Sequence, residues 1–94
     1  MPPKQFLVIS YDIVANSRRR KVMKALEGYG QRVQYSVFEC LLTPAQIVEM
    51  QRRLKKMVGK DDSIRFYSIS ADDVKRIALL GGANVTADRP FILH

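Results

Sequence analysis

The residues best suited to chemistry lie close together near the N-terminus, where a lone carboxylate precedes four consecutive cations. Asp12 follows the apolar, β-prone run Phe6–Ile9, so we expect it at the end of a buried strand, on a rigid support. The cations come next, at the start of a predicted helix: Arg18, Arg19, Arg20 and Lys21. A helix N-terminus carries partial positive charge and disfavours cations, which indicates that a partner outside the helix compensates them.

Phosphate is the obvious compensating partner, because the backbone N–H groups at a helix start also bind anions. A carboxylate beside phosphates suits Mg²⁺, which keeps several waters and takes only one or two protein carboxylates. The sequence therefore predicts a carboxylate with a metal ion, beside a phosphate-binding patch. The alternative for Asp12 is a capping or turn residue. The other acidic pairs, Asp61-Asp62 and Asp72-Asp73, are assigned to turns and helix caps.

Composition agrees with a polyanionic partner. The 94 residues carry a formal net charge of +7, which favours nucleic acid over a charge that serves solubility alone. An apolar content of 47% predicts one folded domain rather than a disordered chain. No apolar run approaches the ~20 residues that span a bilayer, and no signal peptide is recognised. The single cysteine, Cys40, cannot form an internal disulfide, so we expect a cytoplasmic protein.

The elements that must position these residues are two helices and several strands. Ser17 is the expected N-cap of the first helix, and Gly28 and Gly30 are expected to end it. Its residues at helical spacing, which should face the core, are Val22, Met23, Leu26 and Tyr29. The segment Arg32–Leu42 is either one long strand or two short strands that meet in a bend near Ser36.

The second helix has the clearest boundary, a capping box of Thr43 and Gln46 with Pro44 at the first helical position. Gly59 is expected to end it. Its predicted apolar stripe is Ile47, Val48, Met50, Leu54, Met57 and Val58, and its solvated cations are Arg52, Arg53, Lys55 and Lys56. A strand over 64–70, a helical turn from Ser70 to about Ile77, a further strand at 78–80 and a last strand at 91–93 complete the chain. This order predicts an α+β, ferredoxin-like split βαβ sandwich, with two helices on one face of an antiparallel sheet.

The motifs YDI, RRRK, QYSVFEC, TPAQ and IRFYSIS, in this order, resemble those of the CRISPR-associated endoribonuclease family Cas2 over nearly the whole chain. The resemblance implies a homodimer in which the C-terminal strand of one subunit is exchanged onto the sheet of the other. It also implies that 32–42 forms two strands. The implied activity is metal-dependent cleavage of single-stranded RNA or double-stranded DNA, together with a partnership with the CRISPR integrase during spacer acquisition.

The resemblance also assigns roles to individual residues. Asp12 matches the catalytic, metal-binding aspartate, with Mg²⁺ or Mn²⁺ held between the two subunits. Tyr11, Arg19, Arg32 and Phe38 match positions implicated in cleavage in some members, although Phe38 is expected in the core or at the dimer interface rather than as a base-stacking platform. Apart from the resemblance, the arginines expected to hold flanking phosphates are Arg18, Arg19, Arg20 and Arg32. Lys21 stands where some members carry arginine, which keeps the charge but loses bidentate phosphate geometry. The alternative function is a non-catalytic dimeric adaptor that holds DNA and bridges integrase subunits. A ferredoxin-like RNA-recognition module is disfavoured, because its aromatic motif is absent.

Overall fold

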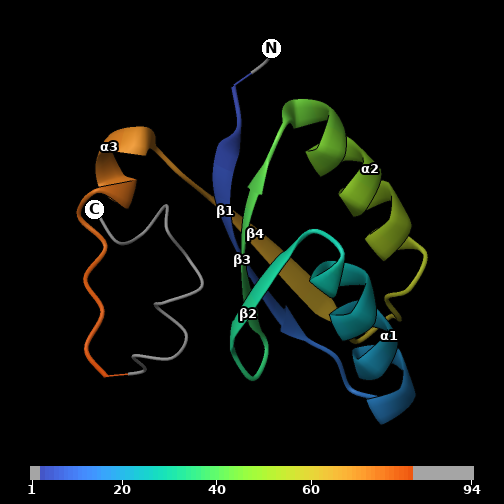
Figure 1. The fold of residues 1–94 in the computed structure, drawn as a ribbon. Coiled ribbons are helices and arrows are strands. Elements are labelled where there is room, and N and C mark those ends of the chain that lie inside the picture. The colour runs from blue at the N-terminus through green and yellow to red at the C-terminus, as the bar shows by residue number, and fades with distance from the viewer. Residues whose placement is uncertain (1–2, 82–94) are drawn as a thin grey trace.

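The computed structural model describes residues 3–81, which are built on a four-stranded antiparallel sheet (Figure 1). The strands are β1 (Gln5–Asp12), β2 (Gly30–Gln34), β3 (Val37–Leu42) and β4 (Ser63–Ile69), in the order β2-β3-β1-β4. The helices are α1 (Asn16–Glu27), α2 (Pro44–Lys55) and the short α3 (Ala71–Val74). This arrangement confirms the predicted α+β, ferredoxin-like fold.

Helices α1 and α2 lie together on one side of the sheet, and α3 lies beyond its other side (Figure 1). Side chains alternate along a strand, so every second residue of β1 and β3 points toward α1 and α2. The buried residues of this layer are Leu7, Ile9 and Tyr11 of β1, Phe38, Cys40 and Leu42 of β3, Val22, Ala25 and Leu26 of α1, and Met50 and Leu54 of α2. The predicted core residues Met23 and Tyr29 are partly buried against this cluster.

The opposite face of the sheet, which we call the open face, is covered by neither α1 nor α2. The strand register places Val8 of β1 between Glu39 of β3 and Tyr67 of β4 on this face. Asp12 follows at the far end of β1, because it lies four residues beyond Val8 and side chains alternate. The open face is partly apolar, and its residues Leu41 and Tyr67 are 38% and 47% exposed.

The structure resolves the ambiguity over 32–42 in favour of two strands. Strands β2 and β3 meet at Tyr35 and Ser36, and the Tyr11 backbone N–H donates to the Ser36 carbonyl at 3.1 Å. Gly30 is the first residue of β2 rather than part of a helix end. A Cβ at Gly30 would lie 2.4 Å from both Cys40 Sγ and the Glu39 carbonyl oxygen, so glycine permits the close approach of β2 to β3.

The helix boundaries confirm two predicted N-caps and correct a third. The Gln46 N–H donates to Thr43 Oγ1 at 3.3 Å, and Gln46 Oε1 accepts from the Thr43 N–H at 2.9 Å, so the capping box is present. Ser17 is not an N-cap, because α1 begins one residue earlier and is capped by Ala15, whose side chain has no acceptor. Ser70 caps α3 as predicted, by accepting from the Asp73 N–H at 3.1 Å.

Other predictions in the second half of the chain need correction. Helix α2 ends at Lys55, before Gly59, and Val48 is 61% exposed rather than part of the buried stripe. Residues 78–80 lie within the described range and are not a strand, and Leu80 is 97% exposed. The predicted last strand at 91–93 falls outside the described residues. None of the helices within residues 3–81 has the length and apolar content of a membrane-spanning segment.

Candidate functional site

Asp12 is exposed at the end of β1, where the sheet register pairs it with Ser63 of β4. A hydrogen-bonded pair of strands therefore supports its backbone, as the sequence predicts. The alternation of β1 separates it from its neighbour, because Asp12 lies on the open face while Tyr11 is buried toward α1 and α2. The sheet thus divides the predicted site residues between its two faces.

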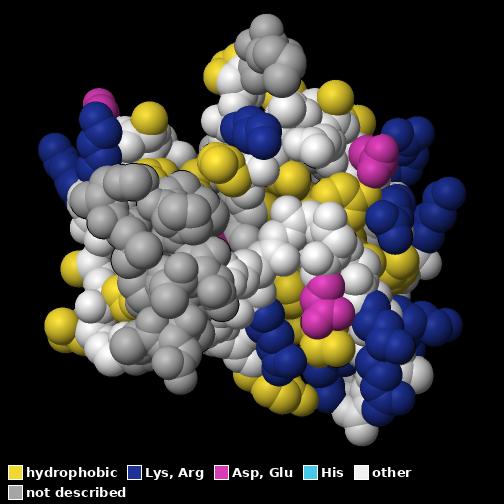
Figure 2. Space-filling view, in the orientation of Figure 1, with side chains coloured by type: hydrophobic (Ala, Val, Ile, Leu, Met, Phe, Trp, Pro, Cys, Tyr) yellow, Lys and Arg dark blue, Asp and Glu magenta, His cyan; other side chains and the backbone are white. Residues whose placement is uncertain are grey.

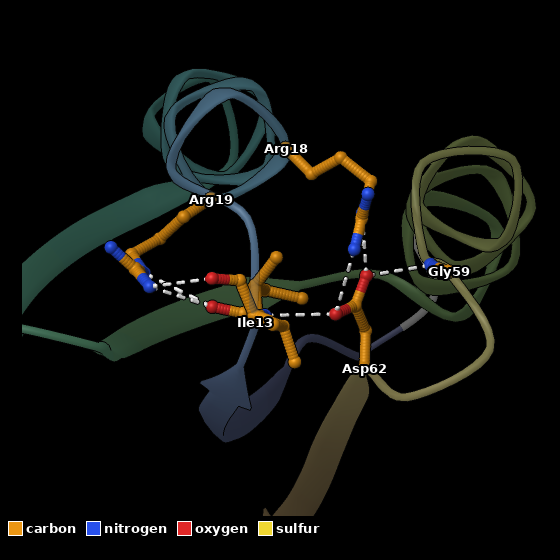
Figure 3. A network of polar contacts seen from close by, with 6 residues as sticks. Ile13, Arg18, Arg19, Gly59 and Asp62 are labelled. Atoms are coloured by element: carbon orange, nitrogen blue, oxygen red, sulfur yellow. Dashed lines mark hydrogen bonds and ion pairs between the residues drawn. The ribbon is translucent and has the colours of Figure 1, made fainter.

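The loop that follows Asp12 is held by Asp62, whose side chain is fully buried (Figure 3). Its carboxylate accepts from the backbone N–H groups of Val14 at 2.9 Å and Gly59 at 2.6 Å. It also accepts from Arg18 through Nε at 2.8 Å and Nη2 at 3.4 Å. The Arg18 hydrogen bond, followed by the two backbone N–H groups, holds the pKa of Asp62 well below its usual range. Asp62 therefore joins the β1–α1 loop, α1 and the α2–β4 loop.

Arg19 holds the same loop from the other side (Figure 3). Its Nη2 donates to the Ile13 carbonyl at 2.8 Å and to the Val14 carbonyl at 3.3 Å, and its Nε donates to Ile13 at 3.2 Å. Its Nη1 donates to the side-chain oxygen of Asn16. The guanidinium thus satisfies carbonyl acceptors of the turn that leads from Asp12 into α1. Internal contacts compensate two of the four consecutive cations, whereas the sequence suggested phosphate for all of them.

The other two cations, Arg20 and Lys21, are exposed and make no hydrogen bond or ion pair within residues 3–81. They belong to a surface that we call the helix-side basic surface, where Lys and Arg gather over α1 and α2 (Figure 2). Its exposed cations are Arg20, Lys21 and Lys24 of α1 and Arg52, Arg53, Lys55 and Lys56 in and after α2. A surface of this charge suits a phosphate backbone.

A pocket of about 350 Å³ lies at one end of the helix-side basic surface, between α1 and the β2–β3 turn. It is lined by Tyr11, Asn16, Arg19, Arg20, Met23, Arg32 and Tyr35. Arg32 lies with its guanidinium carbon 5.2 Å from the centre of the Tyr35 ring, and its Nε donates to the Tyr35 carbonyl at 3.1 Å. This pocket brings Arg19, Arg20 and Arg32 together, while their assignment to nucleic-acid binding stays a prediction. Arg18 does not line it and is paired with Asp62 instead.

Tyr11 and Phe38 support this pocket from the core. Their ring centres are 6.3 Å apart, and they are 4% and 0% exposed. Burial raises the pKa of Tyr11, opposed by the charge of Arg32, and the phenol donates to the Tyr35 carbonyl at 3.3 Å. Because Phe38 has no accessible surface, it cannot stack on a base, and its place is in the packing beneath the hairpin. Among the described residues, the exposed aromatic of this pocket is Tyr35, which the sequence analysis did not select.

Asp12 is the only predicted metal ligand, and no group of three or more His, Cys, Asp or Glu residues within 3–81 could hold a metal ion. One carboxylate alone is a poor Mg²⁺ site, which waters, substrate phosphates and a second carboxylate would complete. The role of Asp62 is not apparent from the sequence, since its partner Arg18 lies 44 residues away. The available signal was an aspartate three residues after Gly59, but that pattern also describes an ordinary turn.

The comparisons with known proteins point to a single family. A family model described as CRISPR associated protein Cas2 matches residues 5–77. The chain is 46% identical to the CRISPR-associated endoribonuclease Cas2 3 of Synechocystis sp., over 84% of this chain and 87% of that protein. A crystal structure of Streptococcus pyogenes Cas2 at pH 6.5 shares 39% identity with a TM-score of 0.72, over 81% of this chain and 99% of that one. A chain of a partial Cas6-RT-Cas1–Cas2 complex shares 28% identity with a TM-score of 0.72, over 81% and 84%.

Proposed function

Because the chain belongs to the CRISPR associated protein Cas2 family, we propose that it is a metal-dependent endonuclease that acts in CRISPR adaptation as a partner of the integrase. Its relatives are named endoribonucleases, and the partial complex contains both Cas1 and Cas2. The observation that carries the proposal is the exposed carboxylate of Asp12 at the end of a hydrogen-bonded central strand, beside a loop fixed by Arg19 and Asp62.

Asp12 would hold Mg²⁺, or Mn²⁺, together with Asp12 of a second copy. When bound, the ion would supply Lewis acidity and a water of lowered pKa. The role of this chain is to present the carboxylate on a rigid strand and to fix the following loop through Arg19 and Asp62. Contacts of the phosphate backbone with Arg20 and Arg32 would orient the nucleic acid, either single-stranded RNA or double-stranded DNA.

We further propose that the active form is a homodimer. A two-fold axis would supply the second carboxylate that Asp12 needs. The partly apolar open face supports this arrangement, because Leu41 and Tyr67 are exposed on the same face as Asp12. The unpaired, buried Cys40 agrees with a cytoplasmic protein, which is the compartment that this function requires.

The second candidate function is a non-catalytic adaptor that holds DNA electrostatically and bridges integrase subunits. The helix-side basic surface favours it, because Arg20, Lys21 and Lys24 are exposed on one helix and need no metal ion to bind phosphate. The carboxylate of Asp12 separates the two functions, since only the nuclease depends on it.

The deciding experiment incubates the purified protein with labelled single-stranded RNA or double-stranded DNA, in Mg²⁺, Mn²⁺ or EDTA. Asp12→Asn is tested beside Asp61→Asn, a matched control at another exposed aspartate. If the protein is a nuclease, cleavage should require the metal ion, and Asp12→Asn but not Asp61→Asn should abolish it. Equal cleavage by the wild type and Asp12→Asn would exclude Asp12 as the catalytic residue. The adaptor would be supported if the protein binds duplex DNA without cleaving it. In that case a separate integration assay with the integrase should show that Asp12→Asn leaves spacer integration unaffected.

A further inference from the structure

Tyr35 is an unusual residue for a turn, because 68% of this large aromatic side chain is exposed. It lies at the junction of β2 and β3 and lines the pocket of about 350 Å³ at the end of the helix-side basic surface. Its side chain makes no hydrogen bond within residues 3–81; the hydrogen bonds at this position are made by its backbone carbonyl. Burial in the core therefore does not explain the aromatic ring at this position.

The turn that carries Tyr35 is held firmly. Its carbonyl accepts from the Tyr11 phenol at 3.3 Å and from Arg32 Nε at 3.1 Å, and the adjacent Ser36 carbonyl accepts from the Tyr11 N–H at 3.1 Å. Tyr11 is itself buried against Phe38. The ring therefore extends from an ordered backbone, so that a ligand would not have to order the turn on binding.

The surroundings of the ring are cationic. Arg32 lies over the Tyr35 ring at 5.2 Å, and Arg20, which is exposed, lines the same pocket. An aromatic ring flanked by cations matches the binding of single-stranded nucleic acid, in which bases stack on aromatic faces while cations contact the backbone. Inside a duplex the bases already stack on each other and offer no free face, so an aromatic platform favours unpaired nucleotides.

We propose that Tyr35 is a stacking platform for one unpaired base of a single-stranded nucleic acid, whose flanking phosphates contact Arg20 and Arg32. Since Arg32 occupies one face of the ring, the base stacks on the other. The proposal rests on the proposed function, because it assumes a nucleic-acid substrate, and it adds that part of this substrate is single-stranded. Its test does not depend on cleavage, because it measures binding alone.

The test measures binding of a short single-stranded oligonucleotide that carries 2-aminopurine, whose fluorescence is quenched by stacking, and of a blunt DNA duplex. The variants are Tyr35→Ala, Tyr35→Phe and Tyr35→Leu. Val48→Ala is the matched control, because Val48 is also exposed, at 61%, and lies on α2 outside this pocket. Thermal unfolding of each variant confirms that it is folded, which is expected because the Tyr35 side chain is mostly solvated.

Tyr35→Ala should weaken single-strand binding roughly 5- to 150-fold and restore the 2-aminopurine fluorescence, with duplex binding unchanged. Tyr35→Phe should bind as the wild type does, and Tyr35→Leu should resemble Tyr35→Ala, because stacking needs the ring and not its hydroxyl. The salt dependence of binding should not change, since no phosphate contact is lost.

Three results would overturn the assignment while leaving the proposed function intact. The first is normal single-strand binding by Tyr35→Ala, and the second is a loss in Tyr35→Phe as large as that in Tyr35→Ala, which would indicate a hydroxyl contact. A wild-type protein that binds the duplex but not the single strand would also reject the platform alone. A wild-type protein that binds neither would reject the platform and the proposed function together.

Discussion

Arg18 and Asp62, 44 residues apart in the sequence, form an ion pair in which Arg18 Nε lies 2.8 Å from Asp62 Oδ2. The pair joins the first turn of α1 to the loop that precedes β4. The same carboxylate accepts from the backbone N–H of Val14, two residues after Asp12. The geometry of the loop beside the proposed catalytic residue therefore depends on a residue that is distant in sequence and that touches no substrate in the proposal.

This relationship predicts a pH dependence of stability. The folded pKa of Asp62 lies below its ordinary value of 3.8, so the folded state binds fewer protons than the unfolded state. The ionised carboxylate contributes its full share of the free energy of unfolding above pH 3.8. This share is lost as the pH falls from 3.8 toward the lower folded pKa. Asp62→Asn should therefore be less stable than the wild type at pH 7, with a difference that narrows below pH 3.8.

Urea unfolding at a series of pH values measures this difference. Asp61→Asn is the control, because Asp61 is exposed and accepts no hydrogen bond within residues 3–81. A difference between Asp62→Asn and the wild type that stays constant down to pH 2 would mean that the folded carboxyl has an ordinary pKa.

Gly30 and Gly28 make a matched pair for the second prediction. A Cβ at Gly30 would lie 2.4 Å from Cys40 Sγ and the Glu39 carbonyl, whereas at Gly28 the nearest atom would be 3.4 Å away. Gly30→Ala must therefore push β2 from β3 and should cost about 1–3 kcal/mol of the free energy of unfolding. Gly28→Ala should change the free energy of unfolding by less than about 1 kcal/mol, since the φ of −76° at Gly28 suits alanine. Equal effects in chemical denaturation would contradict the close approach of the two strands.

The sequence predicts those parts of this structure that depend on local patterns. The capping box at Thr43, the apolar spacing of α1 and the position of Asp12 at a strand end are all local, and all three are found. The family resemblance implicates Phe38 in cleavage, whereas the sequence favours a position in the core or dimer interface, and its complete burial in β3 confirms the core position.

The remaining differences arise from contacts between distant segments. The partner of Arg18 is Asp62, and nothing in the RRRK motif or in the turn sequence distinguishes this pair from a phosphate-binding arginine and a capping aspartate. Likewise, the division of Asp12 and Tyr11 between two faces follows from strand alternation, but which face α1 and α2 cover is a property of the whole fold. Tyr35 is exposed because residues 32–42 form two strands that meet at this residue. The local sequence did not distinguish this arrangement from one long strand.

The third prediction separates the cations of the RRRK motif by the salt dependence of binding to duplex DNA. Arg20 is exposed and unpaired within residues 3–81, so Arg20→Ala should remove a phosphate contact and reduce the slope of log K against log salt by about 0.9. Arg18→Ala should instead lower the melting temperature and leave the slope unchanged, because Arg18 is paired with Asp62. Fluorescence anisotropy across a salt series measures both slopes. An equal reduction in Arg18→Ala would show that Arg18 leaves Asp62 for phosphate.

The fourth prediction concerns the thiol of Cys40, which is 1% exposed. Burial raises its pKa to about 11 from an ordinary value of 9.0, so the folded protein keeps the thiol protonated at neutral pH. A thiol reagent at pH 8 should therefore modify Cys40 only after denaturation. The unfolded thiol ionises first, so this residue's contribution to stability should be lost as the pH rises from 9.0 toward 11. Rapid labelling of the native protein would contradict the burial.

The last prediction separates packing from chemistry at Phe38, a position assigned to cleavage by family resemblance alone. Phe38 is fully buried beside Tyr11, so Phe38→Leu should cost about 1–3 kcal/mol of stability. Tyr11→Phe removes the hydrogen bond to the Tyr35 carbonyl and should cost about 1 kcal/mol. Cleavage is then measured at a temperature where circular dichroism shows both variants folded. If Phe38 acts only through packing, Phe38→Leu cleaves at the wild-type rate there. A fully folded but inactive Phe38→Leu would instead show that the shape of this ring determines the position of the reacting groups.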